Sequence, residues 1–346
     1  MGLKIGIVGL PNVGKSTLFN ALLKRQQALV ANYPFATIEP NVGVVEVPDD
    51  RLSKLAKMSN SGKIVYATVE FVDIAGLVKG ASTGAGLGNK FLSHIREVDL
   101  IVNLMRDFAD NDVVKEGSVD PVSDYEVIKA ELILKDLETV MRVREGKEIR
   151  SRGMEKKKEL VDKLYQGLNE GKRADEVVGV DELEEVKDLC LLSTKKELKV
   201  LNVAEDDARL RENGEQLVIS AKIEAEVAAL GDVEAKEYLS ALGITQSGLN
   251  RLIKAAYKAL GLISFLTTGE MESRAWTTRV GAKAPEAAGV IHTDFEKKFI
   301  KAKVVTYEDF VNLGGWKEAA TAGKLRMEGR DYIMKDGDVV EFMIGS

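Results

Sequence analysis

Residues 9–16 read Gly-Leu-Pro-Asn-Val-Gly-Lys-Ser, and this short stretch decides the fold. The apolar run LKIGIVG at 3–9 leads into it, and Leu18, Leu22 and Leu23 follow at helical spacing. The pattern therefore predicts a strand, a loop and a helix in that order. Glycines let such a loop wrap around an anion and point its N–H groups inward, at the positive end of the following helix.

Four positions in this loop have chemical roles in binding a di- or triphosphate. Gly9 and Gly14 allow the backbone to approach the phosphates, and Lys15 supplies a positive charge to the outer ones. Ser16 supplies a hydroxyl ligand for the Mg²⁺ ion that such phosphates carry. We therefore expect a P-loop nucleotide site.

Two further segments have the order expected of nucleotide-sensing loops. A strand at 67–73 ends in Asp73 of Asp-Ile-Ala-Gly, and this carboxylate is expected in the second coordination shell of Mg²⁺. The backbone N–H of Gly76 can approach the terminal phosphate. Thr37, in the Pro-bracketed loop YPFATIEPN, can reach Mg²⁺ with its hydroxyl when a triphosphate is bound.

The segment expected to recognise the base departs from the GTPase pattern. GTPases carry Asn-Lys-x-Asp there, and its aspartate accepts hydrogen bonds from guanine, whereas this chain has Asn202-Val203-Ala204-Glu205. The lysine is missing and the acid is one methylene longer, so adenine is the expected base. We expect the Asn202 amide to meet the base edge and the loop Ser220-Ala221-Lys222 to complete the base pocket.

The chain is expected to form three parts. Apolar strands at 42–47, 67–73, 99–105, 198–204 and 216–221 alternate with helical stretches. This order predicts an α/β doubly wound, mostly parallel sheet built from residues 1–123 and 198–261. Residues 124–197 are highly charged, with apolar residues at spacings of three and four, and predict an inserted helical coiled-coil hairpin.

The third part, residues 262–346, is expected to be a small α+β domain. Its predicted features are a turn at Asp336-Gly337 between the runs DYIM and VVEFMI, and a helix at about 318–326. In the hairpin, the apolar positions expected to face inward include Leu134 and Met141.

Composition limits the classes of function. The formal charge of −6 argues against a uniformly basic surface, and no sequence-specific DNA binding is expected. Residues 140–175 nevertheless hold eleven Lys and Arg against seven acids, which predicts a local RNA-facing patch or a merely solvated surface. A single cysteine, Cys190, and the lack of about 18 consecutive apolar residues predict a cytoplasmic protein with no membrane segment.

The motifs GLPNVGKST, FATIEPN, VDIAGLVKGAS with GLGNKFLSHIRE, and NVAE closely resemble the YchF or Obg-like ATPase family. The C-terminal part resembles the TGS domain of that family, a β-grasp fold, so the resemblance covers nearly the whole chain. It implies an Obg-type nucleotide domain, ATP hydrolysis in preference to GTP, and association with the ribosome. It places Mg²⁺ on Ser16 and Thr37. The nucleotide contacts it implies are Asn12, Val13, Gly14, Lys15, Ser16, Thr17 and Val203.

Two positions depart from the expected hydrolytic machinery. After Asp-x-x-Gly, Ras-like proteins carry a glutamine that orients the attacking water, but Leu77 stands here and predicts slow hydrolysis. The family has a histidine in a later loop where this chain has Lys115, which could stabilise charge on the phosphoryl oxygens. Asn12 corresponds to a residue that helps hold K⁺ in related G proteins, so K⁺ stimulation is a further hypothesis.

The sequence leaves three functions open. The first is a slow ATPase that regulates a ribosome-linked process and is accelerated by a partner. The second is a nucleotide-gated binding module with negligible turnover, and the third is a GTPase of the translation-factor type. Oligomeric state and the cellular process are not determined by any of these patterns.

Overall fold

The protein divides into two compact units, each described here by itself. The computed structural model describes residues 3–30, 41–74, 86–108, 120–147, 149, 151, 153–212 and 214–345. The first unit comprises Met1–Val45 and Glu70–Leu252, and the second comprises Glu46–Val69 and Ile253–Ser346. The segment 46–69, although it lies between two strands of the first unit in the chain, belongs to the second.

The first unit contains a six-stranded sheet with the strand order β2-β4-β1-β5-β6-β7. Strand β1 pairs in parallel with β4 and β5, and β6 pairs in parallel with β5 and β7. The predicted α/β fold with a mostly parallel sheet is therefore confirmed. The strands are β1 (Lys4–Val8), β2 (Val42–Glu46), β4 (Thr68–Asp73), β5 (Leu100–Asp107), β6 (Lys196–Val203) and β7 (Leu217–Ile219).

Helices bury this sheet on both faces, as its apolar strands require. Seven of the eight residues of β5 are buried. One apolar cluster joins Val8 and Ile101 to helices α3 and α4, and another joins Met105 and Leu201 to α8 and α9. The helical segments of this region are α1 (Lys15–Val30), α3 (Gly86–Glu97), η5 (Ala208–Arg211), α8 (Ala221–Val227), α9 (Asp232–Ala241) and α10 (Gly248–Ala259).

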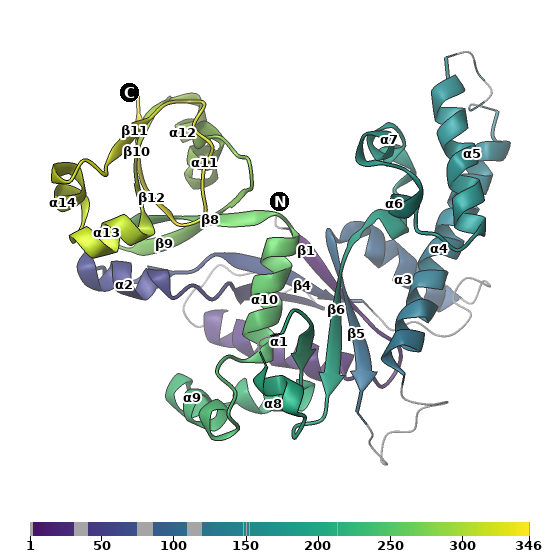
Figure 1. The fold of residues 1–346 in the computed structure, drawn as a ribbon, viewed down its shortest axis with the longest axis horizontal. Coiled ribbons are helices and arrows are strands. Elements are labelled where there is room, and N and C mark those ends of the chain that lie inside the picture. The colour runs from purple at the N-terminus through teal and green to yellow at the C-terminus, as the bar shows by residue number, and fades with distance from the viewer. Residues whose placement is uncertain are drawn as a thin grey trace. The chain divides into compact units, whose positions relative to one another are not determined.

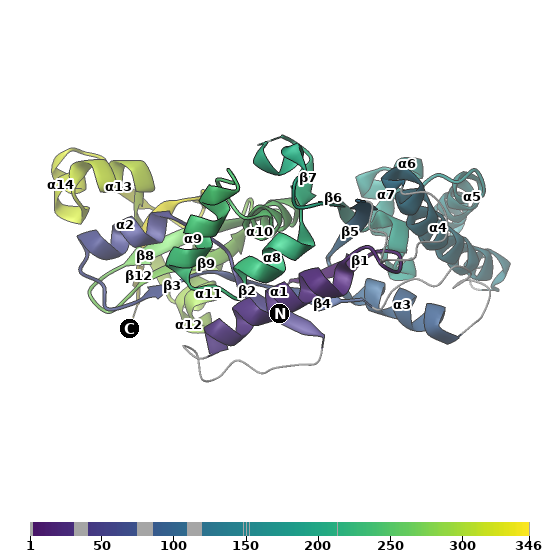
Figure 2. The same cartoon turned by 90° about the horizontal axis from the view of Figure 1, so that it is seen from below.

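The insertion predicted at 124–197 is helical in the structure. Its two long helices, α4 and α5, lie side by side and extend away from the sheet (Figures 1 and 2). Asp120 caps α4 by accepting from the backbone N–H groups of Val122 and Ser123. The elements are α4 (Pro121–Glu145), α5 (Glu155–Asn169), α6 (Ala174–Val177), α7 (Val180–Glu185), η3 (Lys187–Leu189) and η4 (Leu192–Thr194).

The insertion has an apolar core of its own, which includes Val140, Val161 and Leu164. Two of the positions expected to face inward do not, because Leu134 is 46% exposed and Met141 is 39% exposed. A spacing of three and four residues marks one side of a helix, but α4 contacts both the sheet and α5, so its buried side changes along its length.

The second unit is a mixed six-stranded sheet with the order β11-β10-β12-β8-β9-β3. Phe265 and Leu266, neighbours on β8, are both fully buried, so helices cover both faces of the sheet. Helix α11 contacts β9 and β10, while α2 contacts β8 and β9. The strands are β3 (Ile64–Val65), β8 (Leu262–Thr268), β9 (Ser273–Arg279), β10 (Phe299–Thr306), β11 (Arg326–Glu328) and β12 (Asp338–Ile344). The helices are α2 (Arg51–Met58), α11 (Ala284–Ile291), α12 (Thr293–Lys297), α13 (Tyr307–Leu313) and α14 (Trp316–Thr321).

Two local predictions for this unit need correction. The helix expected at about 318–326 is the shorter α14, because Gly323 adopts a left-handed φ of 68° and the chain then enters β11 at Arg326. The run DYIM does not form a strand beside β12. Within it, Ile333 makes an isolated antiparallel bridge to Lys283.

None of the helices in the described ranges combines the length and apolar character needed to cross a bilayer.

Candidate nucleotide site

The loop between β1 and α1 has the tight backbone that its glycines predict. Gly14 adopts a φ of 91°, and a Cβ added there would lie 2.2 Å from the Asn202 side-chain nitrogen. A Cβ at Gly9 would lie 2.8 Å from the carbonyl oxygen of Leu104. Side chains are therefore excluded at both positions by space and at Gly14 also by backbone conformation. Asn12 is also left-handed, with a φ of 62°.

The first turn of α1 suits an anion. It contains no acidic residue that would neutralise the positive end of the helix. Leu18 N–H donates to the Gly14 carbonyl at 3.0 Å, so the N–H groups before it lie ahead of the first helical hydrogen bond. Ser16 and Thr17 are exposed in this turn, where their hydroxyls can meet a ligand.

Lys15 and Asp73 are brought together, as their predicted roles at one site require. The Lys15 ammonium lies 3.1 Å from Asp73 Oδ1 and also donates to the carbonyl oxygen of Ile74. The Lys15 side chain is 11% exposed and that of Asp73 is 22% exposed. Asp73 is the last residue of β4 and Gly9 follows β1, and these parallel strands carry both residues to one edge of the sheet.

The residues at this edge fit a Mg²⁺ ion. Asp73 Oδ1 is buried and accepts no hydrogen bond, although Lys15 is within ion-pair distance. The Asp73 carboxylate and the exposed hydroxyl of Ser16 are hard oxygen groups of the kind that Mg²⁺ prefers. Ser16 is the candidate direct ligand and Asp73 the candidate outer partner.

Asn202 links the phosphate loop to the predicted base loop. Its Nδ2 donates to the Val13 carbonyl at 2.9 Å, and its Oδ1 accepts from the Ala221 N–H at 2.8 Å. The residue is 4% exposed. The sequence predicts that the Asn202 amide meets the base edge, and the structure adds a positioning role that depends on residues far away in the chain.

The other predicted base-pocket residues lie beside Asn202. Ser220 caps α8 and Val203 is 2% exposed, so Val203 can meet a ligand only through its backbone. Glu205 and Lys222 form an ion pair at 2.7 Å, which joins the end of β6 to the start of α8. The acid that departs from the GTPase pattern therefore has a cation beside it.

A second ion-pair cluster lies at the same end of the sheet and was not predicted. Arg209 contacts Asp107, the last residue of β5, at 2.7 Å and Asp207 at 2.6 Å. The hydrogen bond from Arg209 lowers the pKa of Asp207. Asp207 and Arg209 are two residues apart, so a local ion pair could have been proposed from the sequence, but nothing local indicates Asp107.

A buried carboxylate lies behind the base loop. Glu224 on α8 is 3% exposed, and its Oε1 accepts from the Gly248 N–H at 2.7 Å. Burial raises the pKa of Glu224, while the nearby charge of Arg25 opposes that shift. The Glu224 carboxylate thereby joins α8, which begins at the base loop, to the first residue of α10.

We expect Glu224→Gln to change the pH dependence of stability. Because the pKa of Glu224 is raised in the folded state, ionising it opposes folding, and the penalty grows as the pH rises above about 4.5 toward the raised value. Glutamine avoids that penalty. The melting temperature of the variant relative to wild type should therefore rise with pH, by about 3–5 °C for each pH unit by which the pKa is raised.

Thermal melts between pH 4 and 8 measure this effect. Glu237→Gln, at an exposed position on α9, is the matched control and should leave the pH profile unchanged. Parallel profiles for wild type and Glu224→Gln would contradict the expectation.

Four residues with predicted roles lie outside the described residues. They are Thr37, Gly76, Leu77 and Lys115. Their predicted contacts with Mg²⁺, the terminal phosphate and the attacking water stay predictions.

The basic hairpin carries less free charge than its composition indicates. Among the described residues of 140–175, six Lys and Arg residues are in ion pairs, and four of them pair with acids beyond residue 175. The pairs are Lys156 with Glu185, Lys157 with Asp188, Lys163 with Glu182, Arg144 with Asp162, Lys172 with Glu170, and Arg173 with Asp175 and Glu197. Within the described part of the hairpin, Arg142, Lys147 and Lys158 are exposed and lie outside these pairs.

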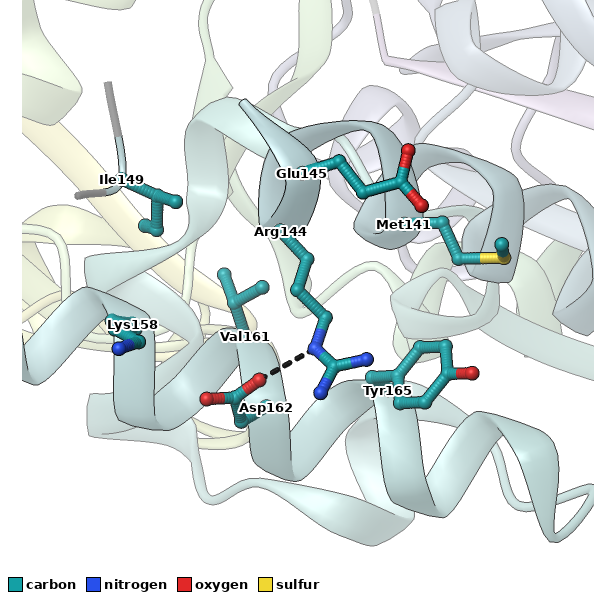
Figure 3. Close-up of a pocket in the computed structure, with 8 residues that line it drawn as sticks. All are labelled: Met141, Arg144, Glu145, Ile149, Lys158, Val161, Asp162 and Tyr165. Atoms are coloured by element: carbon teal, nitrogen blue, oxygen red, sulfur yellow. Dashed lines mark hydrogen bonds and ion pairs between the residues drawn. The ribbon is translucent and has the colours of Figure 1, made fainter. Parts of the chain in front are cut away.

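A hollow of about 530 Å³ lies between α4 and α5 near these cations (Figure 3). The Arg144 guanidinium lies over the Tyr165 ring, 4.2 Å from its centroid, and its Nε donates to Asp162 at 2.6 Å. Figure 3 shows Lys158 on the same side of the helix pair. A planar cation on an aromatic ring is a surface on which a nucleobase can stack.

Two family models match separate parts of the chain. Residues 4–143 match a family model described as a 50S ribosome-binding GTPase. Residues 262–345 match the YchF-GTPase_C model, described as a protein of unknown function (DUF933).

Full-length relatives are also similar. The chain is 49% identical to the ribosome-binding ATPase YchF of Bacillus subtilis and 45% identical to that of Escherichia coli O157:H7, with 99% of each chain covered. The solved structure of the Schizosaccharomyces pombe YchF GTPase matches with a TM-score of 0.87 and 38% identity, over 99% of this chain and 98% of that one.

Proposed function

The chain belongs to the YchF family, and on that premise we propose that it binds ATP in preference to GTP, hydrolyses it slowly, and associates with the ribosome. Relatives that it matches from end to end carry the name ribosome-binding ATPase. The nucleotide domain corresponds to the predicted residues 1–123 and 198–261 without 46–69 and 253–261, which belong to the second unit. The coiled-coil insertion corresponds to 124–197, and the second unit contains a TGS domain at 262–346. The protein acts in the cytoplasm.

Phosphate binding rests on the loop and on Lys15. The glycine-bounded loop and the unneutralised first turn of α1 hold the phosphates, and Lys15 exchanges Asp73 for the outer phosphoryl oxygens. Ser16 and Thr37 would hold Mg²⁺, with Asp73 as the outer partner, and the bound ion would supply positive charge to the phosphoryl oxygens. K⁺ near Asn12 is a second proposed ion, and equal turnover in Na⁺ and K⁺ would exclude it.

Slow turnover follows from Leu77, which can neither donate nor accept a hydrogen bond to orient water. Lys115 is the candidate for stabilising charge in its place. We therefore expect acceleration by a partner. Single-turnover hydrolysis with and without ribosomes tests this expectation, and a rate that ribosomes leave unchanged would favour a nucleotide-gated binding module.

The preference for adenine is carried by one observation, the ion pair between Glu205 and Lys222. Guanine recognition needs a carboxylate free to accept from N1–H and the 2-amino group. Here the carboxylate is longer and is engaged by a lysine. The Schizosaccharomyces pombe relative is named a GTPase, so the alternative base has to be tested directly.

Titration calorimetry with ATP and GTP is the deciding measurement. We expect tighter binding of ATP by wild type. Glu205→Asp should shift the ratio of the two dissociation constants toward GTP by about tenfold or more, since a hydrogen bond to a charged group contributes about 1.5–3 kcal/mol. Asp206→Glu, at the exposed neighbouring position, is the control. Tighter binding of GTP by wild type would overturn the proposal.

Ribosome association is proposed to involve the hairpin. The exposed cations Arg142, Lys147 and Lys158 can contact RNA phosphates, and the hollow beside Arg144 and Tyr165 can receive a base. Because phosphate contacts release counterions, ribosome binding should weaken as salt rises. Sedimentation with ribosomes at increasing KCl measures this dependence.

A further inference from the structure

The segment 46–69 connects two strands of the first sheet, yet its own residues are built into the second unit. We propose that this segment is a strap that couples the nucleotide state at Asp73 to the sheet of the second unit. The proposal rests on the nucleotide binding proposed above. It concerns regulation rather than chemistry at the phosphates.

Backbone hydrogen bonds make the strap part of the second sheet. Strand β3 pairs in parallel with β9, with Ile64 opposite Ser273 and Val65 opposite Arg274. Gly62 N–H donates to the Glu270 carbonyl at 2.8 Å. A strand paired in this way cannot move along its axis without breaking the ladder.

A cluster of hydroxyls fastens the turn before β3. Ser61 and Ser273 lie 2.8 Å apart through their hydroxyl oxygens, and Thr268 donates to Ser59 at 2.8 Å. Thr268 and Ser273 are 2.7 Å apart. Ser273 is fully buried, whereas Ser59, Ser61 and Thr268 are partly exposed, so the connected network runs from the surface turn to a buried residue of β9.

Helix α2 carries the ion pair of the strap. The Arg51 guanidinium contacts Asp336 at 2.7 Å and Asp49 at 2.7 Å, and Asp336 also accepts from the Ser264 N–H at 2.9 Å. The two carboxylates raise the pKa of Arg51. Leu52 and Leu55 on the same helix are fully buried. Arg51 therefore fixes α2 to both β8 and the turn before β12.

The other end of the strap leads directly to the nucleotide site. Strand β4 begins at Thr68 and pairs with β1 from Glu70 to Asp73. Val69, the last residue of the strap, lies four positions before Asp73, a distance of about 13 Å along a strand. A paired strand is stiff, so a displacement of Asp73 when Lys15 turns to the phosphates is passed to the strap.

Hydrogen exchange of the full-length protein tests the proposal, with and without a non-hydrolysable ATP analogue and Mg²⁺. In wild type the analogue should change amide exchange in β8 and β9 (residues 262–279) about fivefold or more, within the range usual for coupled sites. Arg51→Met and Asp336→Asn should reduce that change to less than about twofold while calorimetry shows analogue affinity within about threefold of wild type.

Lys303→Met is the matched control, because Lys303 pairs with Glu341 on the same sheet away from the strap, and it should keep the full response. Asp336→Asn retains an oxygen that can accept from the Ser264 N–H. The coupling can therefore be tested with this variant alone if Arg51→Met fails to fold. Two outcomes would overturn the proposed coupling through the strap. In the first, wild type binds the analogue but amide exchange in residues 262–279 does not change. In the second, both strap variants keep the full exchange response. A wild type that binds no analogue overturns the proposed function and the strap with it.

Discussion

Replacing Lys15 with methionine is expected to lower single-turnover ATP hydrolysis about 10²–10³-fold, the usual loss when one group that stabilises transition-state charge is removed. Lys15 is 11% exposed and already lies at the mouth of the phosphate loop against Asp73. Its charge therefore acts in a partly desolvated place, where it is screened less than a surface charge. Methionine keeps the length and the helix propensity but removes the charge.

The measurement is hydrolysis of labelled ATP with enzyme in excess, alongside calorimetry for binding. Lys24→Met is the matched control, since Lys24 is an exposed residue of the same helix, and it should behave as wild type. Lys15→Arg keeps the charge in a different shape and should recover part of the affinity without the full rate. If Lys15→Met hydrolyses ATP at the wild-type rate, the phosphates do not bind at Lys15.

The phosphate loop is predictable from sequence because its determinants are local. A run of apolar residues, two glycines and a helical repeat fall within about twenty positions, and β1, the loop and α1 follow in that order. The conformation of Gly14 is also a local property, since a left-handed φ favours glycine. The placement of Lys15 beside Asp73 could be expected because parallel strands end at one edge of a sheet.

The linkage through Asn202 is not predictable in the same way. Its partners Val13 and Ala221 lie 189 and 19 residues away, and both are backbone groups, which carry no residue-type signal. A sequence motif can mark Asn202 as a polar residue at a strand end. Only the folded sheet shows that the amide also joins two loops.

The placement of the strap in the second unit cannot be predicted from the sequence, for a similar reason. Residues 46–69 follow a strand of the nucleotide sheet in the chain, and sequential elements usually stay neighbours. Strand β3 is two residues long and pairs with a strand more than 200 positions away, so it leaves no periodic pattern. The hydroxyl network of Ser59 and Ser61 reads as an ordinary polar turn in the sequence.

A count of charged residues overstates the unpaired positive charge of the hairpin, because it does not show which acids the fold places beside the cations. The excess of Lys and Arg at 140–175 is real, but α7 and η3 fold back and place Glu182, Glu185 and Asp188 beside those cations. The charge count over residues 140–175 leaves out these three acids. The surface proposed for RNA is therefore smaller and consists of the exposed cations Arg142, Lys147 and Lys158.

Asn202→Ala is the second change with a large expected effect, on stability and binding together. It leaves the Val13 carbonyl and the Ala221 N–H without their buried partner, and each unsatisfied group costs about 1–3 kcal/mol. Because the two loops then lose their common support, nucleotide affinity should fall by about tenfold or more. Thermal melting without ligand and calorimetry with ATP measure the two effects separately.

Asn202→Asp separates the two hydrogen bonds of this side chain. The aspartate can still accept from the Ala221 N–H but cannot donate to the Val13 carbonyl, so it should lose the support of the phosphate loop and keep that of the base loop. Asn169→Ala, which removes an exposed amide bound to the Tyr165 carbonyl, is the control and should change neither measurement. If Asn202→Ala binds ATP as tightly as wild type, the amide has no part in holding the loops, and the nucleotide site is organised by the backbone of the phosphate loop alone.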